Sequence, residues 1–125
     1  MMVEPEYVPG QVWNYKTRTD EADSTLTILK IESYPALTTI HIRIDNVRIT
    51  DCQGDQVSHT ISHAPITKDA LDQSVTQLVR QEPKIPGFEK EYQDWISDQG
   101  GTFIMPVAEV AAILEDTCRY GNKIT

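Results

Sequence analysis

One short run of residues constrains the fold of this chain more than any other feature. Residues 40–45 read IHIRID, so isoleucine alternates with polar residues at every second position. A period of two is typical of a β-strand with one face on a core and the other in water, and strands of that kind belong to antiparallel sheets. The apolar phase then moves to Val47, and a one-residue slip of this kind requires a bulge or a turn, for which Asn46 is suited.

Three further segments predict strands beside this one. Residues 11–15 (QVWNY) place Trp13 and Tyr15 on one face of a strand. Residues 24–33 are rich in Thr, Ile and Leu and read as the second strand of a hairpin, after a polar turn. Residues 57–63 form a weaker fourth strand that ends at Ala64-Pro65.

The second half of the chain carries helical periodicity. A helix is expected from Thr67, a good N-cap, with an apolar stripe formed by Leu71, Val75, Leu78 and Val79. After Pro83 and Pro86-Gly87, a second helix carries an aromatic stripe formed by Phe88, Tyr92 and Trp95. Residues 102–105 could form a short edge strand, and a third helix is expected to have Pro106 at its first position and Gly121 as its C-cap.

Strands followed by helices predict an α+β fold. We expect an antiparallel sheet of four or five strands, an N-terminal meander, with about three helices from the C-terminal half packed on one face. The length of 125 residues corresponds to a single domain. Within it, residues 1–9 are expected to form an extended arm, residues 11–63 to be mainly β and residues 67–120 to be mainly α.

The net charge of -8 is the compositional property that bears most on function. Residues 1–65 contain five Lys and Arg against nine Asp and Glu, and residues 66–125 contain six against ten, so both halves are equally acidic. An acidic surface repels phosphates, which argues against nucleic acid as a partner. The same field attracts a basic protein and speeds its encounter with the chain.

The expected compartment is cytoplasmic. The first residues, MMVEPEYVPG, have neither the basic nor the apolar region of a secretory signal, and no apolar run is long enough to span a membrane. Cys52 and Cys118 are accordingly expected to be free thiols.

No catalytic or cofactor motif occurs in the sequence. There is no GxGxxG or GxxxxGK[ST] run, and Ser and His near residue 60 lack the glycines of a nucleophile elbow. His59 and His63 would lie roughly 13 Å apart along a strand, too far to share a metal, although His41 could pair across the sheet with one of them. We expect no catalytic residue, no metal and no cofactor.

Two groups of acidic residues are candidates for partner binding. Glu91, Asp94 and Asp98 are spaced i, i+3 and i+7 and share one face of the second helix, opposite its aromatic residues. The turn after the first strand carries a second acidic patch, formed by Asp20, Glu21 and Asp23. Either group could instead be a solvated surface with no partner.

The run GQVWNYKTR, residues 10–18, combines aromatic and basic side chains in a way that single-strand binders use to stack bases. The acids that follow it would neutralise such a patch. We therefore expect Trp13 and Tyr15 to be largely buried, and Lys16 and Arg18 to pair with nearby carboxylates.

This run, together with STLTILKIE at residues 24–32, resembles the start of small uncharacterised bacterial proteins. In its size, its acidity and its lack of catalytic motifs the chain is also similar to the immunity proteins of bacterial toxin–immunity pairs. That group is defined by role and has many folds, so the likeness implies a role and not a structure.

The leading hypothesis is a non-catalytic cytosolic binding protein, and specifically an immunity-type inhibitor that occludes a basic toxin such as a nuclease. A first alternative is a small enzyme or ligand-binding domain that uses a sheet face lined by His41, His59 and His63. A second is a homodimeric or larger structural subunit that associates through a sheet edge or the aromatic helix.

Overall fold

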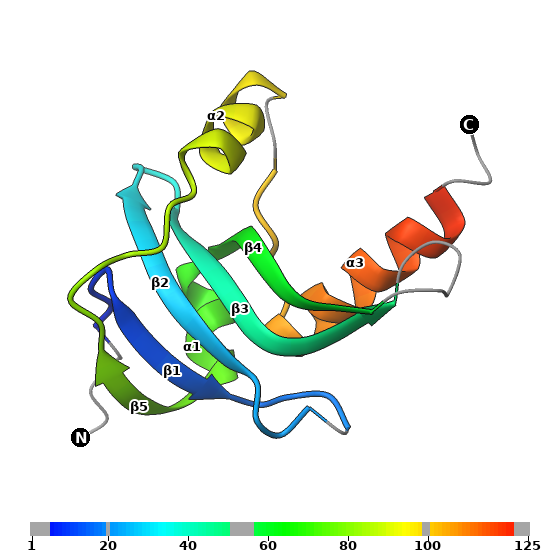
Figure 1. The fold of residues 1–125 in the computed structure, drawn as a ribbon. Coiled ribbons are helices and arrows are strands. Elements are labelled where there is room, and N and C mark those ends of the chain that lie inside the picture. The colour runs from blue at the N-terminus through cyan, green and yellow to red at the C-terminus, as the bar shows by residue number, and fades with distance from the viewer. Residues whose placement is uncertain (1–5, 20, 51–56, 99–100, 122–125) are drawn as a thin grey trace.

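The chain folds into an α+β structure built on one open antiparallel sheet of five strands, as the sequence predicts (Figure 1). A computed structural model describes residues 6–19, 21–50, 57–98 and 101–121. The strands are β1 Gln11–Tyr15, β2 Thr25–Ser33, β3 Thr38–Thr50, β4 Val57–Thr67 and β5 Val75–Gln81, and their order across the sheet is β4-β3-β2-β1-β5. The helices are α1 Lys68–Ser74, α2 Glu89–Ser97 and α3 Val107–Gly121.

The alternation in residues 40–45 sets the two faces of the sheet. Ile40, Ile42 and Ile44 are all fully buried, and they pack with residues of α1 and α3. The core that they form extends across β2 and β4 and into both helices; among its members are Leu26, Ile28, Ile66, Leu71, Val107 and Val110. Since side chains alternate along a strand, the residues between the isoleucines point to the opposite face.

The expected slip in β3 occurs at Asn46, which has a positive φ of 59°. The strand continues through this residue, but its register with β4 shifts between Asp45 and Ile49, and Val47 becomes fully buried. Asparagine is one of the few residues other than glycine that adopts this backbone region at low cost. The bulge thus keeps the apolar residues of β3 in the core on both sides of Asn46.

The prediction of a helix from Thr67 is confirmed at the start of the helix and wrong at its end. Thr67 caps α1 by accepting a hydrogen bond from the amide of Ala70, and Leu71 is buried. From Val75, however, the chain forms β5, which pairs antiparallel with β1, and Leu78 and Val79 are exposed. Pairing satisfies the backbone groups along the outer edge of β1, which a longer helix would leave open, and this gain outweighs the helical periodicity.

The fifth strand of the sheet is therefore β5, because the segment at residues 102–105 makes only an isolated parallel bridge from Phe103 to Ile66. The third helix agrees with expectation. It follows Pro106, ends at Gly121, and buries Val107, Val110 and Ala111.

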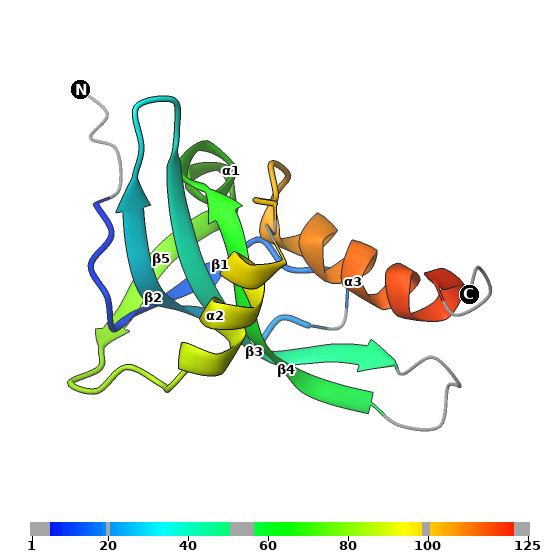
Figure 2. The ribbon, with the colours of Figure 1, turned by 90° about the horizontal axis from the view of Figure 1, so that it is seen from above.

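The three helices do not form one layer. Helices α1 and α3 cover the face of Ile40 and Ile42, whereas α2 lies over the face of His41 (Figure 2). The reason is that the aromatic rings of α2 pack on that face against His41 and against its neighbour His63 on β4. None of the described helices lies over the remainder of that face, on β1, β2 and β3.

The run at residues 10–18 is largely structural. Tyr15 is buried and its hydroxyl contacts that of Ser24 at 2.6 Å, while Trp13 is half-buried against the core. Arg18 forms the expected ion pair with Glu21, at 2.7 Å, and a second with Glu115, at 3.3 Å. Lys16 is exposed and forms no ion pair with a described residue.

Two other expectations concern the membrane and the cysteines. None of the described helices has the length and apolar character that spanning a membrane requires. Cys52 and the side chain of Cys118 lie outside the described residues, so the free-thiol prediction stays a prediction.

Candidate functional site

Helix α2 is anchored to the sheet by three aromatic rings that cover His41. Phe88, Tyr92 and Trp95 form the stripe expected from the sequence, and their ring centroids lie 6.4, 5.3 and 4.9 Å from that of His41. His41 has no exposed surface. A helix of nine residues is marginal on its own, and Phe88 provides no side-chain cap, so these contacts are what order α2.

A chain of short hydrogen bonds runs beneath the rings. Glu32 Oε1 lies 2.6 Å from Nε2 of His41, and Nδ1 of His41 lies 2.7 Å from Nε2 of His63. The hydroxyl of Tyr92 donates to the other carboxylate oxygen of Glu32 at 2.7 Å. These four residues, which we call the His41 network, join β2, β3 and β4 to α2.

The charge of Glu32 fixes the protons in this network. Burial opposes ionisation, but hydrogen bonds from Tyr92, His41 and Tyr34 outweigh it and lower the pKa of the carboxyl group. An ionised carboxylate only accepts, so His41 donates from Nε2 and presents a bare Nδ1. His63 must then donate from its Nε2 and keep a lone pair on Nδ1.

Both histidines are held neutral at pH 7. Burial lowers the pKa of His41, although the nearby Glu32 carboxylate partly opposes the shift. Burial and the neighbouring His41 lower the pKa of His63 to about 4, against a smaller opposing effect of Glu91. If both histidines were protonated, the two facing nitrogens would both be donors, so the hydrogen bond between the rings allows at most one proton to be added to the pair.

A cation adds a further anchor. The ammonium of Lys30, on β2, lies 4.6 Å from the centroid of the Tyr92 ring, within cation–π range. Trp95 also donates from Nε1 to the carbonyl of Gly101 at 3.1 Å. The first contact joins α2 to β2, and the second ties the end of α2 to the segment that follows the helix.

Three predicted site residues lie on or beside the outer surface of α2. Asp94 and Asp98 are exposed, and Glu91 is half-buried on the flank of the helix nearest His63. Lys90 pairs with Asp94 at 2.9 Å, in a contact that is largely open to water. We call Glu91, Asp94 and Asp98 the α2 acidic face.

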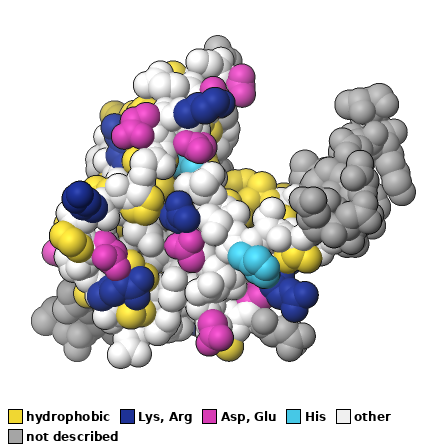
Figure 3. Space-filling view, viewed as in Figure 1, with side chains coloured by type: hydrophobic (Ala, Val, Ile, Leu, Met, Phe, Trp, Pro, Cys, Tyr) yellow, Lys and Arg dark blue, Asp and Glu magenta, His cyan; other side chains and the backbone are white. Residues whose placement is uncertain are grey.

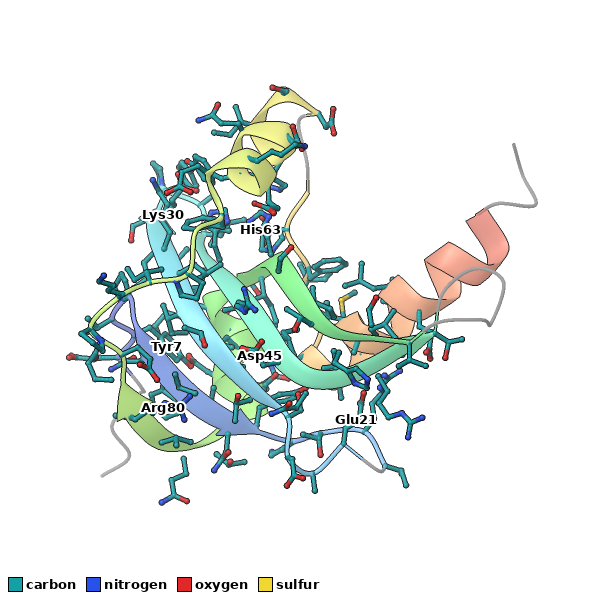
Figure 4. The ribbon with its side chains drawn as sticks, in the orientation of Figure 1. Tyr7, Glu21, Lys30, Asp45, His63 and Arg80 are labelled. Carbon is teal, nitrogen blue, oxygen red and sulfur yellow. The ribbon has the colours of Figure 1, made fainter. Side chains whose placement is uncertain are left out.

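The second acidic patch does not form as expected. Glu21 is only 4% exposed and binds both the side chain of Arg18 and the backbone amide of Arg48, so it is not available to a partner. Asp23 is exposed. Asp20 lies outside the described residues. The turn that holds Glu21 is at the opposite end of β2 from α2, so the two acidic groups do not make one surface (Figure 4).

The histidine-lined face of the first alternative is formed only in part. His41 and His63 meet, as one of the two pairings considered, but His59 is exposed and contacts the carbonyl of Val47. Nowhere in the described residues do three His, Cys, Asp or Glu side chains form a group that could hold a metal. A substrate could reach His41 only if α2 moved away.

The second alternative was a subunit that associates with other copies through a sheet edge or through the aromatic helix, and the structure leaves only the sheet edge available. The rings of Phe88, Tyr92 and Trp95 pack inward, so they are not available for association through an aromatic helix face. The sheet edge at β5 is open among the described residues, although β5 is bulged at two places in its pairing with β1. Bulges are a common means of discouraging pairing at an edge.

Sequence reasoning found the aromatic stripe and one histidine pairing but missed Glu32 and Lys30. Both lie on β2, and their contacts with α2 depend on how helix and sheet are placed. Their spacing from Tyr92, some sixty residues, gives no periodic signal. Comparison of the chain with known protein families, curated proteins and solved structures found no match.

Proposed function

We propose that this chain is a non-catalytic protein that binds a basic protein partner through the α2 acidic face. The observation that carries the proposal is the division of α2 into two sides. Its rings lock onto the His41 network, and its acids point to solvent or to the flank of the helix.

Rigid presentation supports a binding role. A helix held by ring packing, a hydrogen bond from Tyr92 and a cation–π contact loses little conformational freedom when a partner docks. Preorganisation of this kind raises affinity because the ordering has already taken place in the free protein.

The position of the acids also supports the proposal. Asp94 and Asp98 lie in the last turn and at the C-cap of α2, where the helix dipole disfavours negative charge, and the last turn contains no basic residue. Acids placed there cost the helix about 0.3–1 kcal/mol each. A partner with a basic surface would offset that cost.

The net charge suggests the class of partner. With a charge of -8, the chain attracts basic proteins from a distance. In its most specific form, the proposal is an immunity-type inhibitor from a bacterium, in which α2 occludes the active site or nucleic-acid groove of a basic toxin such as a nuclease.

Affinity capture from the cells that express the chain tests the proposal. The immobilised protein is compared with the variant Glu91→Gln/Asp94→Asn/Asp98→Asn. A control, Glu6→Gln/Asp69→Asn/Glu109→Gln, makes the same change in net charge at exposed positions outside α2. We expect a basic protein to bind the wild type and the control but not the α2 variant. Capture of the same proteins by all three, or of no basic protein, would show the proposal to be wrong.

A further inference from the structure

The part of the sheet face of His41 that no described helix covers contains a hollow of about 340 Å³, lined on one side by the segment after β5. Its floor follows one row across the sheet, because Val12 pairs with both Arg80 and Thr27, and Thr27 pairs with Arg43. Residues directly opposite each other in an antiparallel sheet point to the same face. The two arginines therefore rise from the two ends of a row that spans roughly 14 Å.

Three cations surround this hollow. Arg43, Arg80 and Lys84 all line it, and basic and acidic side chains mix over this face of the molecule (Figure 3). Nine lysines and arginines have described side chains, so one third of them gather here in a chain of net charge -8. Two carboxylates, Asp45 and Glu82, also line the hollow, and the five groups together carry a net positive charge.

The arginines keep donors free for a ligand. Arg43 donates from Nε to Asp45 at 3.0 Å, and Arg80 donates from Nε to Glu82. Each carboxylate thus holds the inner nitrogen of its arginine. Among the described residues, nothing hydrogen-bonds the terminal guanidinium nitrogens of either arginine, or the ammonium of Lys84. A guanidinium with two free NH₂ groups matches the oxygens of a phosphate.

A hydroxyl at the floor supplies a second, independent feature. Thr27 is only 5% exposed, and its hydroxyl has no hydrogen-bond partner among the described residues. Over the same residues, no fully buried side-chain nitrogen or oxygen lacks a partner. The Thr27 hydroxyl must therefore reach solvent, and Thr27 is one of the residues that line this hollow. A nearly buried polar group without a protein partner is typical of a surface that a polar ligand completes.

We propose that this hollow binds a small organic phosphate. Arg43, Arg80 and Lys84 would contact the phosphoryl oxygens, and the Thr27 hydroxyl would hydrogen-bond the ligand from below. The volume lies at the small end of the range of ligand pockets and exceeds what a single inorganic phosphate fills. The site is separate from the α2 acidic face and does not depend on the proposed function.

Titration calorimetry with inorganic pyrophosphate, a compact probe with two phosphoryl groups, tests this site at low ionic strength. We expect saturable binding with a Kd on the order of 0.1–1 mM. The variant Arg43→Gln/Arg80→Gln/Lys84→Gln should weaken binding at least tenfold. The control Lys16→Gln/Arg48→Gln/Lys90→Gln removes the same charge from positions outside the hollow and should bind as the wild type does.

Two single variants test the site even if the triple variant fails to fold. Lys84 is exposed and forms no ion pair with a described residue, so Lys84→Gln should fold normally and bind several-fold more weakly. Thr27→Val keeps the shape of the floor and should also bind several-fold more weakly, because only the hydroxyl is lost. Absence of saturable binding to the wild type, or equal loss in the hollow variant and its control, would overturn the proposal.

Discussion

Lowering the pH should reduce the free energy of unfolding, because it removes much of the stabilisation that the His41 network provides. The pKa of His63 is about 4 in the folded chain and 6.5 in the unfolded chain. Between these values the unfolded chain binds a proton that the folded chain does not, so unfolding takes up protons and stability falls as the pH falls. The lowered pKa of His41 acts in the same direction.

The size of the effect follows from the two pKa values. From pH 7 to pH 5, a histidine with these values loses at most about 2 kcal/mol of unfolding free energy. Because His63 is partly open to solvent, we expect about 1–2 kcal/mol from this residue. Most carboxylates titrate below this window, which isolates the histidine contribution.

Urea unfolding, followed by tryptophan fluorescence at pH 7, 6 and 5, measures the loss. In the variant His63→Gln, the side-chain amide can still donate to His41, but the titrating group is gone. We expect its stability to fall less steeply with pH than that of the wild type, by about 1–2 kcal/mol over the two units. His59→Gln, which replaces an exposed histidine outside the network, should keep the wild-type slope. Equal slopes for the wild type and His63→Gln would refute the reasoning.

Three further predictions concern single positions, and urea unfolding at pH 7 checks each of them. Tyr92→Phe removes the hydrogen bond to the ionised Glu32 and should cost about 1–2 kcal/mol; no loss would mean that the hydroxyl does not anchor α2. Asn46→Gly should be tolerated while Asn46→Ala costs about 1 kcal/mol, because only the alanine is strained at a φ of 59°; equal stabilities would argue against the bulge. Glu21→Gln should cost about 2–3 kcal/mol and Asp23→Asn almost nothing, since only Glu21 is buried and paired; similar values would contradict its burial.

The sheet could be predicted where apolar and polar residues alternate at every second position of the sequence. The isoleucines of residues 40–44 fixed both the strand and the face on which the core lies, and the slip after them marked the bulge at Asn46. Residues 75–79 were predicted to continue the helix, because Val75, Leu78 and Val79 extend its apolar stripe, whereas the structure forms a strand there. The open edge of β1 decided between the two, and a long-range pairing of that kind leaves no mark in the local pattern.

The site was predictable only in its parts. The aromatic stripe of α2 and the possible pairing of His41 could be identified from spacing, and both are present. Glu32 was not found, because a single acid on a strand is unremarkable until a helix is placed over it. Glu21 looked like a surface acid for a related reason, since its burial depends on Arg18 and on the backbone of β3.

The rate of association with the captured basic partner tests the central claim most directly. Stopped-flow measurements at low salt and at about 0.5 M salt compare the wild type, the Glu91→Gln/Asp94→Asn/Asp98→Asn variant and its charge-matched control. If the α2 acidic face guides binding, the α2 variant should associate about tenfold or more slowly at low salt, and the difference should shrink at high salt. The control should remain close to the wild type. Equal rates for the two variants would show that overall charge, and not this helix, attracts the partner.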